Sequence, residues 1–278
     1  MNLQNPKIAL VIVLISLPMI WWACEEPVPH SIESGVLLFE DEFDGTSLDL
    51  SKWKYDIGRG NNGWGNQELQ FYKAENTTVS NGTAKITVKK DDDLDYTSSK
   101  IKTDGRFTSR YGKVQARIKT VKGKGLWPAF WLLPSHGDWP CDGEIDIMEQ
   151  GNRVALDPNN YTSNESTGAA HLGKCPYSGS THDYESFHKK ISYGSYADYF
   201  HVYEIRWEPN RISWYIDDEY VFQVTPNSYP SYTWPFNLSE WYLIINLAID
   251  SGGPNEDTQF PSQMEIDWVR WYSLEHDN

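Results

Sequence analysis

The 278-residue chain carries 24 Lys and Arg against 39 Asp and Glu, a formal net charge of −15 at pH 7. This charge disfavours nucleic acid and other polyanions as partners, because phosphate backbones are bound mainly through cations. A neutral or cationic partner is expected. The 13 Trp and 17 Tyr provide more aromatic surface than the core of one domain obviously needs, so part of it is available for binding.

Residues 1–23 are predicted to be a signal peptide of the bacterial lipoprotein type. Lys7 precedes an apolar stretch, residues 8–22, which is short for a transmembrane span and typical of a signal. The stretch ends at Ala23 and Cys24, and a small residue before a cysteine is typical of a lipoprotein cleavage site. Cys24 is therefore predicted to carry the lipid, with ordinary secretion and an unmodified cysteine as the alternative.

Residues 24–35 are acidic and contain prolines, which predicts a tether. The expected location is the bacterial cell envelope, as a surface lipoprotein of the outer membrane. Contact with the membrane is expected only through the lipid on Cys24, and the protein is expected to be a monomer.

Residues 36–278 are predicted to form a single all-β domain, an antiparallel β-sandwich. No internal repeat divides them, and no stretch keeps a 3.6-residue apolar period over three turns, so helix is expected to be minor. Short runs rich in β-branched and aromatic residues alternate with Gly, Pro, Asn and Asp, as in strands and turns. The expected strands include residues 84–90, 111–120, 200–207, 212–218, 220–224 and 241–249, with turns at "EPN" (208–210) and "DDE" (217–219).

The stretch "CDGEIDIMEQ" (141–150) has the apolar residues of a strand but also four carboxylates. Side-chain alternation places Glu144 and Asp146 on one face of this strand and turns Glu149 to the other. Asp142 is expected to be solvated. Regular strand geometry would therefore separate the two glutamates.

A β-bulge near Ile147 and Met148 is predicted, because one extra residue resets the alternation and returns Glu149 to the Glu144 face. The three acids would then share one concave surface. At least one pKa is expected to rise there, since ionising neighbouring acids together is unfavourable. An exposed acidic strand or a cation site is the alternative, because carboxylate clusters also bind calcium.

Two carboxylates on one face suit retaining glycoside hydrolysis. One ionised carboxylate attacks the anomeric carbon, and one protonated carboxyl about 5 to 5.5 Å away donates to the leaving oxygen. The middle acid, Asp146, can hold Glu144 through a shared proton and influence how charge divides between the acids.

Trp127, Trp131 and Trp139 precede this stretch and are expected to reach the same face. Sugar rings are neutral and have apolar C–H faces, so a sugar site uses aromatic platforms with a few hydrogen-bonding groups. One or two of the three tryptophans are expected to pack in the core, because Trp is usually highly buried.

These residues resemble glycoside hydrolase family sixteen, in particular its laminarinase-like members. "GEIDIMEQ" matches the bulged E-x-D-x-x-E signature of that family, and "WPAFWLLP" matches the segment before it. The resemblance covers nearly the whole chain after the predicted signal. It includes "DEFDG" (41–45), "KWKYDIG" (52–58), "GWGNQELQFY" (63–72), "YGKVQARIKT" (111–120), "FHVYEIRWEPNRISWYID" (200–217) and "MEIDWVRWY" (264–272).

The resemblance implies a β-jelly-roll with a groove across its concave sheet, which cleaves internal β-glucan bonds with retention and needs no cofactor for catalysis. It implies that Glu144 is the nucleophile, Glu149 the general acid/base and Asp146 the assisting carboxylate. The residues implied to bind the substrate are Asn66, Arg106, Trp127, Trp131, Trp139 and His171. For His171, a loop histidine that serves only as a hydrogen-bond partner is the alternative.

The resemblance also implies a structural calcium held by backbone oxygens and an aspartate of the last strand. The corresponding residues are Glu42, Gly82 and Asp267, an oxygen-only set suited to a hard cation. A pairing of Asp267 with Arg270 or with a backbone amide is the alternative.

Cys141 and Cys175 remain after Cys24 is assigned to the lipid. Export favours a disulfide between them, and two separate thiols are the alternative. Residues 152–190 are polar and are expected to form a long loop that narrows the groove, and a Cys141–Cys175 disulfide would anchor this loop beside the site.

The expected substrate is β-1,3-glucan (laminarin) or mixed-linkage β-1,3-1,4-glucan, because an acidic protein supplies few cations for sulfated galactans. Two alternatives remain. One is a transglycosylase acting on the same glucans, and the other is a surface glycan-binding lipoprotein without catalysis.

Overall fold

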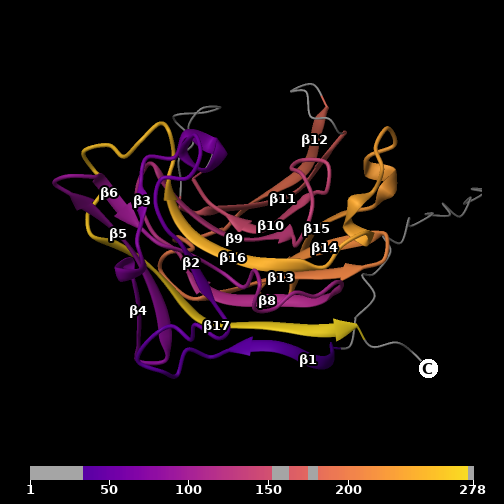
Figure 1. The fold of residues 1–278 in the computed structure, drawn as a ribbon, viewed down its shortest axis with the longest axis horizontal. Coiled ribbons are helices and arrows are strands. Elements are labelled where there is room, and N and C mark those ends of the chain that lie inside the picture. The colour runs from indigo at the N-terminus through magenta and orange to yellow at the C-terminus, as the bar shows by residue number, and fades with distance from the viewer. Residues whose placement is uncertain (1–33, 152–162, 175–180, 275–278) are drawn as a thin grey trace, which may run out of the picture. The chain divides into compact units, whose positions relative to one another are not determined.

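Two stacked β-sheets make up the computed structural model, which describes residues 34–151, 163–174 and 181–274 (Figure 1). The described residues cluster as one compact unit. The predicted signal peptide, Cys24 and nearly all of the predicted tether lie outside the described residues. The first strand begins at Ser34, two residues before the predicted start of the domain. In the described part of the chain, no helix is long and apolar enough to span a membrane.

The larger sheet has the strand order β15-β14-β13-β8-β17-β5-β6-β3, with β1 paired to β17 and β4 paired to β5. Its pairs are antiparallel except for the short β3–β6 pair. Its strands are β1 (Ser34–Asp41), β3 (Phe71–Tyr72), β4 (Thr77–Ser80), β5 (Thr83–Asp91), β6 (Asp95–Ser98), β8 (Gly112–Lys119), β13 (His201–Glu208), β14 (Arg211–Ile216), β15 (Glu219–Val224) and β17 (Ser262–Leu274).

The second sheet has the order β12-β11-β10-β9-β16-β7-β2 and is antiparallel throughout its described pairs. Its strands are β2 (Lys54–Asp56), β7 (Lys100–Lys102), β9 (Leu126–Pro134), β10 (Glu144–Glu149), β11 (Glu165–Gly173), β12 (His182–Lys190) and β16 (Trp241–Ile249). In Figure 1 β9, β10 and β16 lie above β8 and β17 of the larger sheet, with β11 and β12 rising at one side. The predicted antiparallel sandwich is confirmed.

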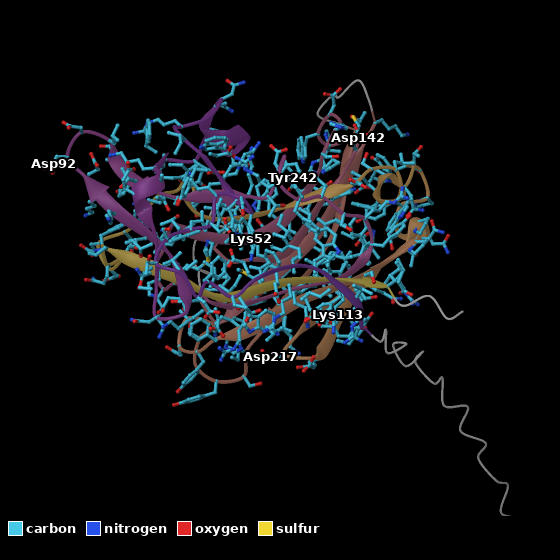
Figure 2. All side chains as sticks on the ribbon, turned by 60° about the horizontal axis from the view of Figure 1, so that its bottom comes forward. Lys52, Asp92, Lys113, Asp142, Asp217 and Tyr242 are labelled. Atoms are coloured by element: carbon cyan, nitrogen blue, oxygen red, sulfur yellow. The ribbon has the colours of Figure 1, made fainter. Side chains whose placement is uncertain are left out.

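Helix is minor, as predicted. The described helical segments are η1 (Gly63–Gln67), η2 (Ala74–Asn76), η3 (Pro226–Ser228) and η4 (Pro235–Asn237). The predicted turns at residues 208–210 and 217–219 join β13 to β14 and β14 to β15. Figure 2 shows Asp217, in the second of these turns, on the opposite side of the sandwich from Asp142.

The core between the sheets follows from strand alternation. In β8, Val114, Ala116 and Ile118 are buried, while the residues between them are partly exposed. β16 is buried along nearly its whole length, as its two apolar faces predicted. Burial of this much apolar surface is the main force that holds the sheets together. Five tryptophans of the core are fully buried, namely Trp53, Trp207, Trp214, Trp241 and Trp271.

The prediction of one long loop over residues 152–190 was wrong for residues 165–173 and 182–190, which form two strands. β11 and β12 occupy much of it and extend the second sheet beyond β10. β11 has the sequence "ESTGAAHLG", in which small residues replace the β-branched residues typical of strands. β12 is polar because it is the last strand on that side of the sheet. Residues 152–162 and 175–180 lie outside the described residues.

Candidate active site

The predicted β-bulge is present in β10. Between Asp146 and Glu149, two residues of β10 lie opposite one residue of each neighbouring strand. The two residues of the bulge, Ile147 and Met148, both have side chains buried in the core. Glu149 is consequently returned to the face that carries Glu144, and both line the same cavity.

Two contacts accommodate the bulge. Gly168 of β11 lies opposite it, and a Cβ there would come within 2.7 Å of the Asp146 carbonyl oxygen and of the Phe187 ring. Trp214 of the larger sheet donates its indole Nε1–H to the same carbonyl at 2.9 Å. A bulge interrupts the strand ladder, so this hydrogen bond satisfies a carbonyl that would otherwise be buried without a partner.

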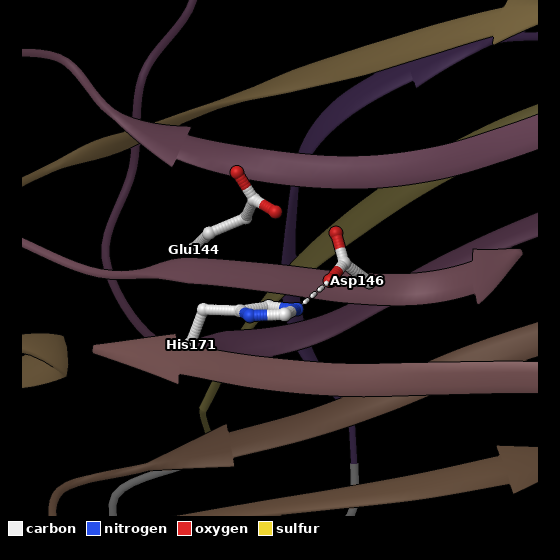
Figure 3. A group of neighbouring side chains, drawn as sticks. All are labelled: Glu144, Asp146 and His171. Atoms are coloured by element: carbon white, nitrogen blue, oxygen red, sulfur yellow. Dashed lines mark ion pairs between the residues drawn. The ribbon is translucent and has the colours of Figure 1, made fainter. Parts of the chain in front are cut away.

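The three carboxylates stand on the floor of a cavity of about 350 Å³ over the second sheet. Asp146 is 3% exposed and Glu149 is 8% exposed, while Glu144 is partly exposed. Figure 3 shows the side chains of Glu144 and Asp146 on the same side of β10, with His171 of β11 beside them.

Burial of neighbouring acids raises their pKa values, as the sequence predicted. Burial, and next the negative charge of Asp146, raises the pKa of Glu144 to about 8, although His171 opposes the shift. The pKa of Asp146 is raised well above its ordinary value by burial and by Glu149. The substrate-free site therefore holds protons that isolated carboxylates would lose near neutral pH.

His171 contacts the middle carboxylate directly. Its Nε2 lies 3.0 Å from Asp146 Oδ2, while its Nδ1 lies 2.9 Å from Nε2 of His182 on β12. The His171 ring also stacks on Tyr184, with 5.1 Å between ring centroids. His171 thus lies in a strand beside the carboxylates and not in a loop, and it does not belong to the residues lining the cavity. Its role in substrate binding stays a prediction.

The three predicted tryptophans all line the cavity. Trp127 and Trp131 are partly exposed, and Trp139 is 46% exposed. The expectation that one or two of them pack in the core was wrong, because β9 turns its odd-numbered residues 127–133 to the cavity and its even-numbered residues to the core. Trp127 Nε1 donates to Glu149 Oε1 at 2.9 Å, which joins one platform to one carboxylate.

A hydrogen-bond network fixes the second platform. Trp131 donates to Asn246 at 2.7 Å, Asn246 donates to the Tyr72 hydroxyl at 3.1 Å, and that hydroxyl donates to Glu68 at 3.1 Å. Burial raises the pKa of Glu68. Lys100 lies beside the network, with its Nζ 5.0 Å from the centroid of the Trp131 ring.

The sequence reasoning missed several cavity residues. They are Trp64, Gly65, Glu68, Lys100, Ala129, Leu133 and Asn246. Trp64 and Glu68 lie in the quoted stretch "GWGNQELQFY", and Asn246 is the one amide in the apolar run "WYLIINLAI", so signals for these three existed. Trp64 is brought close by Gly60, where a Cβ would approach the indole to 2.4 Å.

Of the predicted substrate-binding residues Asn66 and Arg106, one lies at the cavity and the other does not. Asn66 lines the cavity and contacts Glu68 at 3.3 Å, whereas Arg106 is exposed and does not belong to the residues lining the cavity. Asp142 is partly exposed and its carboxylate accepts from the Asp138 backbone N–H at 2.7 Å (Figure 2). It therefore organises the loop before β10.

The three residues predicted to bind calcium lie in β17 or next to the ends of strands that pair with it. The last residue of β1, Asp41, pairs with Val269, and Glu42 follows it directly. Near the start of β5, Ala84 pairs with Ile266, and Gly82 comes just before that strand. The Asp267 carboxylate forms an ion pair with Arg117, not with Arg270.

Arg270 instead binds the Glu42 carboxylate through two hydrogen bonds, of 2.7 and 2.9 Å. Cys141 is disulfide-bonded. Its predicted partner, Cys175, lies outside the described residues, so that pairing stays a prediction.

Paired carboxylates beneath tryptophan platforms, on one sheet of an antiparallel sandwich, define a site of the glycoside hydrolase type. The chain belongs to glycosyl hydrolases family 16, whose family model matches residues 65–270.

Relatives of known activity agree with this assignment. The chain is 34% identical to the beta-glucanase of Rhodothermus marinus, over 95% of this chain and 92% of that protein. It is 33% identical to glucan endo-1,3-beta-glucosidase A1 of Niallia circulans over 88% of this chain, which corresponds to 39% of that longer protein. The solved endo-beta-1,3-glucanase of Pyrococcus furiosus is 36% identical, with a TM-score of 0.75 over 86% of this chain and 94% of that one.

Proposed function

We propose that this protein is a retaining endo-β-glucanase that hydrolyses internal bonds of β-1,3-glucan or mixed-linkage β-1,3-1,4-glucan. The observation that carries the proposal is the bulge of β10, which places Glu144 and Glu149 on one face beneath the tryptophans. The reaction requires these two carboxyl groups and water, and no cofactor.

Glu144 is the proposed nucleophile. Its carboxylate attacks the anomeric carbon from the floor of the groove and forms a covalent glycosyl-enzyme. Burial and the neighbouring Asp146 raise the pKa of Glu144, so its ionised form needs a compensating contact. A proton on Asp146 that is shared with Glu144 makes ionisation of Glu144 less unfavourable, because it removes the repulsion between two charged carboxylates.

Glu149 is the proposed general acid/base. It gives its proton to the leaving oxygen in the first step and removes a proton from water in the second. Trp127 holds Oε1 of Glu149 through the indole N–H, so the carboxyl group keeps one orientation in both steps. His171 positions Asp146 from the side.

The proposed substrate follows from the lining of the cavity and from the names of the relatives. Trp64, Trp127, Trp131 and Trp139 offer flat apolar surfaces to neutral sugar rings, and the carboxylates disfavour anionic polymers. The relatives named above are a beta-glucanase and two endo-1,3-glucanases. Hydrolysis is favoured over transglycosylation on this ground, and both carboxylates argue against a purely glycan-binding role.

Product analysis after digestion of laminarin, barley mixed-linkage glucan and agarose tests the proposal. Internal cleavage predicts a rapid fall in viscosity and a ladder of oligosaccharides from at least one of the two glucans. Cleavage of agarose alone would contradict the proposed substrate and leave the proposed mechanism intact. Accumulation of products longer than the starting oligosaccharides would favour the transglycosylase.

We also propose that the backbone oxygens of Glu42 and Gly82, together with Asp267, hold a structural calcium. Their positions in β17 or next to the ends of strands that pair with it support this, and oxygen ligands suit a hard cation. Because Asp267 is paired with Arg117, binding requires the carboxylate to turn toward the ion. Calcium is expected to raise Tm over that measured in EDTA, and Asp267→Asn is expected to remove the difference.

The lipid anchor on Cys24 and a place in the outer membrane are proposals from the sequence. In cells, Cys24→Ser is expected to move the protein from the membrane fraction to the soluble fraction. Unchanged fractionation of the variant would contradict the anchor. The proposed monomer is tested by light scattering on the chain without its first 24 residues.

A further inference from the structure

Three ligand atoms of the type that first-row transition metals prefer converge beside the proposed nucleophile. A carboxylate oxygen of Glu144, a carboxylate oxygen of Asp146 and a ring nitrogen of His171 all lie within 4.8 Å of one another (Figure 3). The closest pair, His171 Nε2 and Asp146 Oδ2, is 3.0 Å apart. Tetrahedral zinc, with bonds of about 2.0 to 2.2 Å, holds its ligand atoms about 3.4 Å apart, so small side-chain rotations complete the geometry.

Asp146 supplies an independent sign of a ligand. Its side chain is 3% exposed, and Oδ2 has no hydrogen-bond partner among the described residues, because the contact with His171 is close but lacks hydrogen-bond alignment. A buried carboxylate oxygen without a hydrogen bond is rare in folded proteins. This atom is therefore left without a hydrogen bond beside the His171 ring nitrogen and within 4.8 Å of a Glu144 carboxylate oxygen.

The ring nitrogen of His171 that faces away from the carboxylates has a hydrogen-bond partner, as is usual for metal-binding histidines. When its Nδ1–H donates to His182 Nε2, at 2.9 Å, its own Nε2 presents a lone pair to the two carboxylates. Stacking on Tyr184 and on His182, both at 5.1 Å between centroids, holds the ring plane. The orientation of the nitrogen is thus fixed before a metal arrives.

We propose that Glu144, Asp146 and His171 form a Zn²⁺ site, with water as the fourth ligand, and that the bound ion inhibits the enzyme. The mixture of one imidazole and two carboxylates selects zinc over Ca²⁺ and Mg²⁺, which prefer oxygen ligands alone. The inhibitory role rests on the proposed function, because zinc holds the carboxylate that attacks the sugar. The net charge of −15 further concentrates cations near the protein.

Isothermal titration of the tag-free protein with ZnCl₂ tests the site without any assay of activity. One tight Zn²⁺ per chain is expected, and His171→Gln and Glu144→Gln are each expected to weaken it at least about tenfold. His182→Phe keeps an aromatic ring for stacking but removes the supporting nitrogen, and a loss of about tenfold or more is expected. Using three variants protects the test against one that does not fold.

His188→Gln is the matched control, because His188 also contacts a carboxylate, Glu165, but belongs to a different pair on β12. Its zinc affinity is expected to equal that of the wild type. Laminarin hydrolysis by the wild type should fall over the same Zn²⁺ concentrations and recover with EDTA. Absence of tight binding, or binding unchanged in His171→Gln, would overturn the site. An inactive protein that still binds zinc would count against the proposed function alone.

Discussion

At the scale of single residues, the site depends on how three neighbouring acids share their protons. Burial and mutual repulsion raise the pKa of Glu144 and of Asp146, whereas His171 opposes the shift at Glu144. Sequence spacing predicted that the acids share a face and that a pKa rises. It did not predict the His171–His182 pair, because the signal for that contact is the register of β11 against β12 and not a motif.

The shared protons make a prediction for Asp146→Asn. A glutamate with a raised pKa is protonated below that pKa and becomes a nucleophile above it, so it sets the acid limb of kcat/KM. Removing the Asp146 charge lowers the pKa of Glu144, and the acid limb is expected to move to lower pH. The value of kcat is expected to fall about 100-fold, because Glu144 loses its positioning partner.

Initial rates on laminarin across the pH range check this prediction. Glu265→Gln, which removes a surface acid paired with Lys119, provides a control whose pH profile should match the wild type. An acid limb for Asp146→Asn that stays in place or moves to higher pH would contradict the coupling.

At the scale of elements, the bulge of β10 is the feature that makes the site possible. Alternation in a short acidic strand was sufficient to predict it, because regular pleating would have buried Glu149 in the core. The supports of the bulge come from distant segments, Gly168 of β11 and Trp214 of β14, and no local pattern reveals them. The sequences of β11 and β12 do not predict strands either, because small residues dominate β11 and polar residues dominate β12.

Trp214→Phe is predicted to impair both stability and catalysis. The change leaves the buried Asp146 carbonyl without its donor and opens space in the core, which is expected to cost about 2 to 4 kcal/mol of unfolding free energy. The freed bulge also displaces the carboxylates, so kcat is expected to fall at temperatures where the variant remains folded.

Trp271→Phe is the matched control for this prediction. Trp271 is equally buried, lies in the same sheet as Trp214 and also donates to a backbone carbonyl. Its acceptor is Tyr111, whereas Trp214 binds the carbonyl of the catalytic-strand residue Asp146. Urea unfolding should show a comparable loss of stability, while kcat of the folded protein should stay near that of the wild type. Equal losses of kcat in both variants would mean that the indole of Trp214 has no special relation to the site.

At the scale of the whole molecule, charge and architecture agree with a neutral polymer as substrate. The net charge predicted that polyanions are excluded, and the apolar pattern predicted a sandwich. Both properties are sums over many residues, so they can be read from the sequence without knowing individual contacts. Network residues such as Lys100 and Asn246 were not predicted, since each derives its role from partners that the fold brings together. The pairing of Asp267 with Arg117 was missed for the same reason.

The negative charge predicts how substrate binding depends on salt. For laminarin, KM is expected to change little from about 20 to about 500 mM NaCl, because screening affects only interactions between charges. Carboxymethylated β-glucan is expected to be a poor substrate at low salt and to improve as salt screens its repulsion from the protein. A laminarin KM that rises steeply with salt would show that cations of the protein carry the binding.

The most direct measurement of the central claim is to trap the glycosyl-enzyme. An activated 2-deoxy-2-fluoro β-1,3-glucoside slows both steps through its fluorine, while its good leaving group lets the first step proceed, so a covalent adduct accumulates. Tandem mass spectrometry of the peptide containing residues 141–150 is predicted to place one sugar on Glu144. A label on Glu149 or Asp146, or turnover without any covalent adduct, would contradict the mechanism.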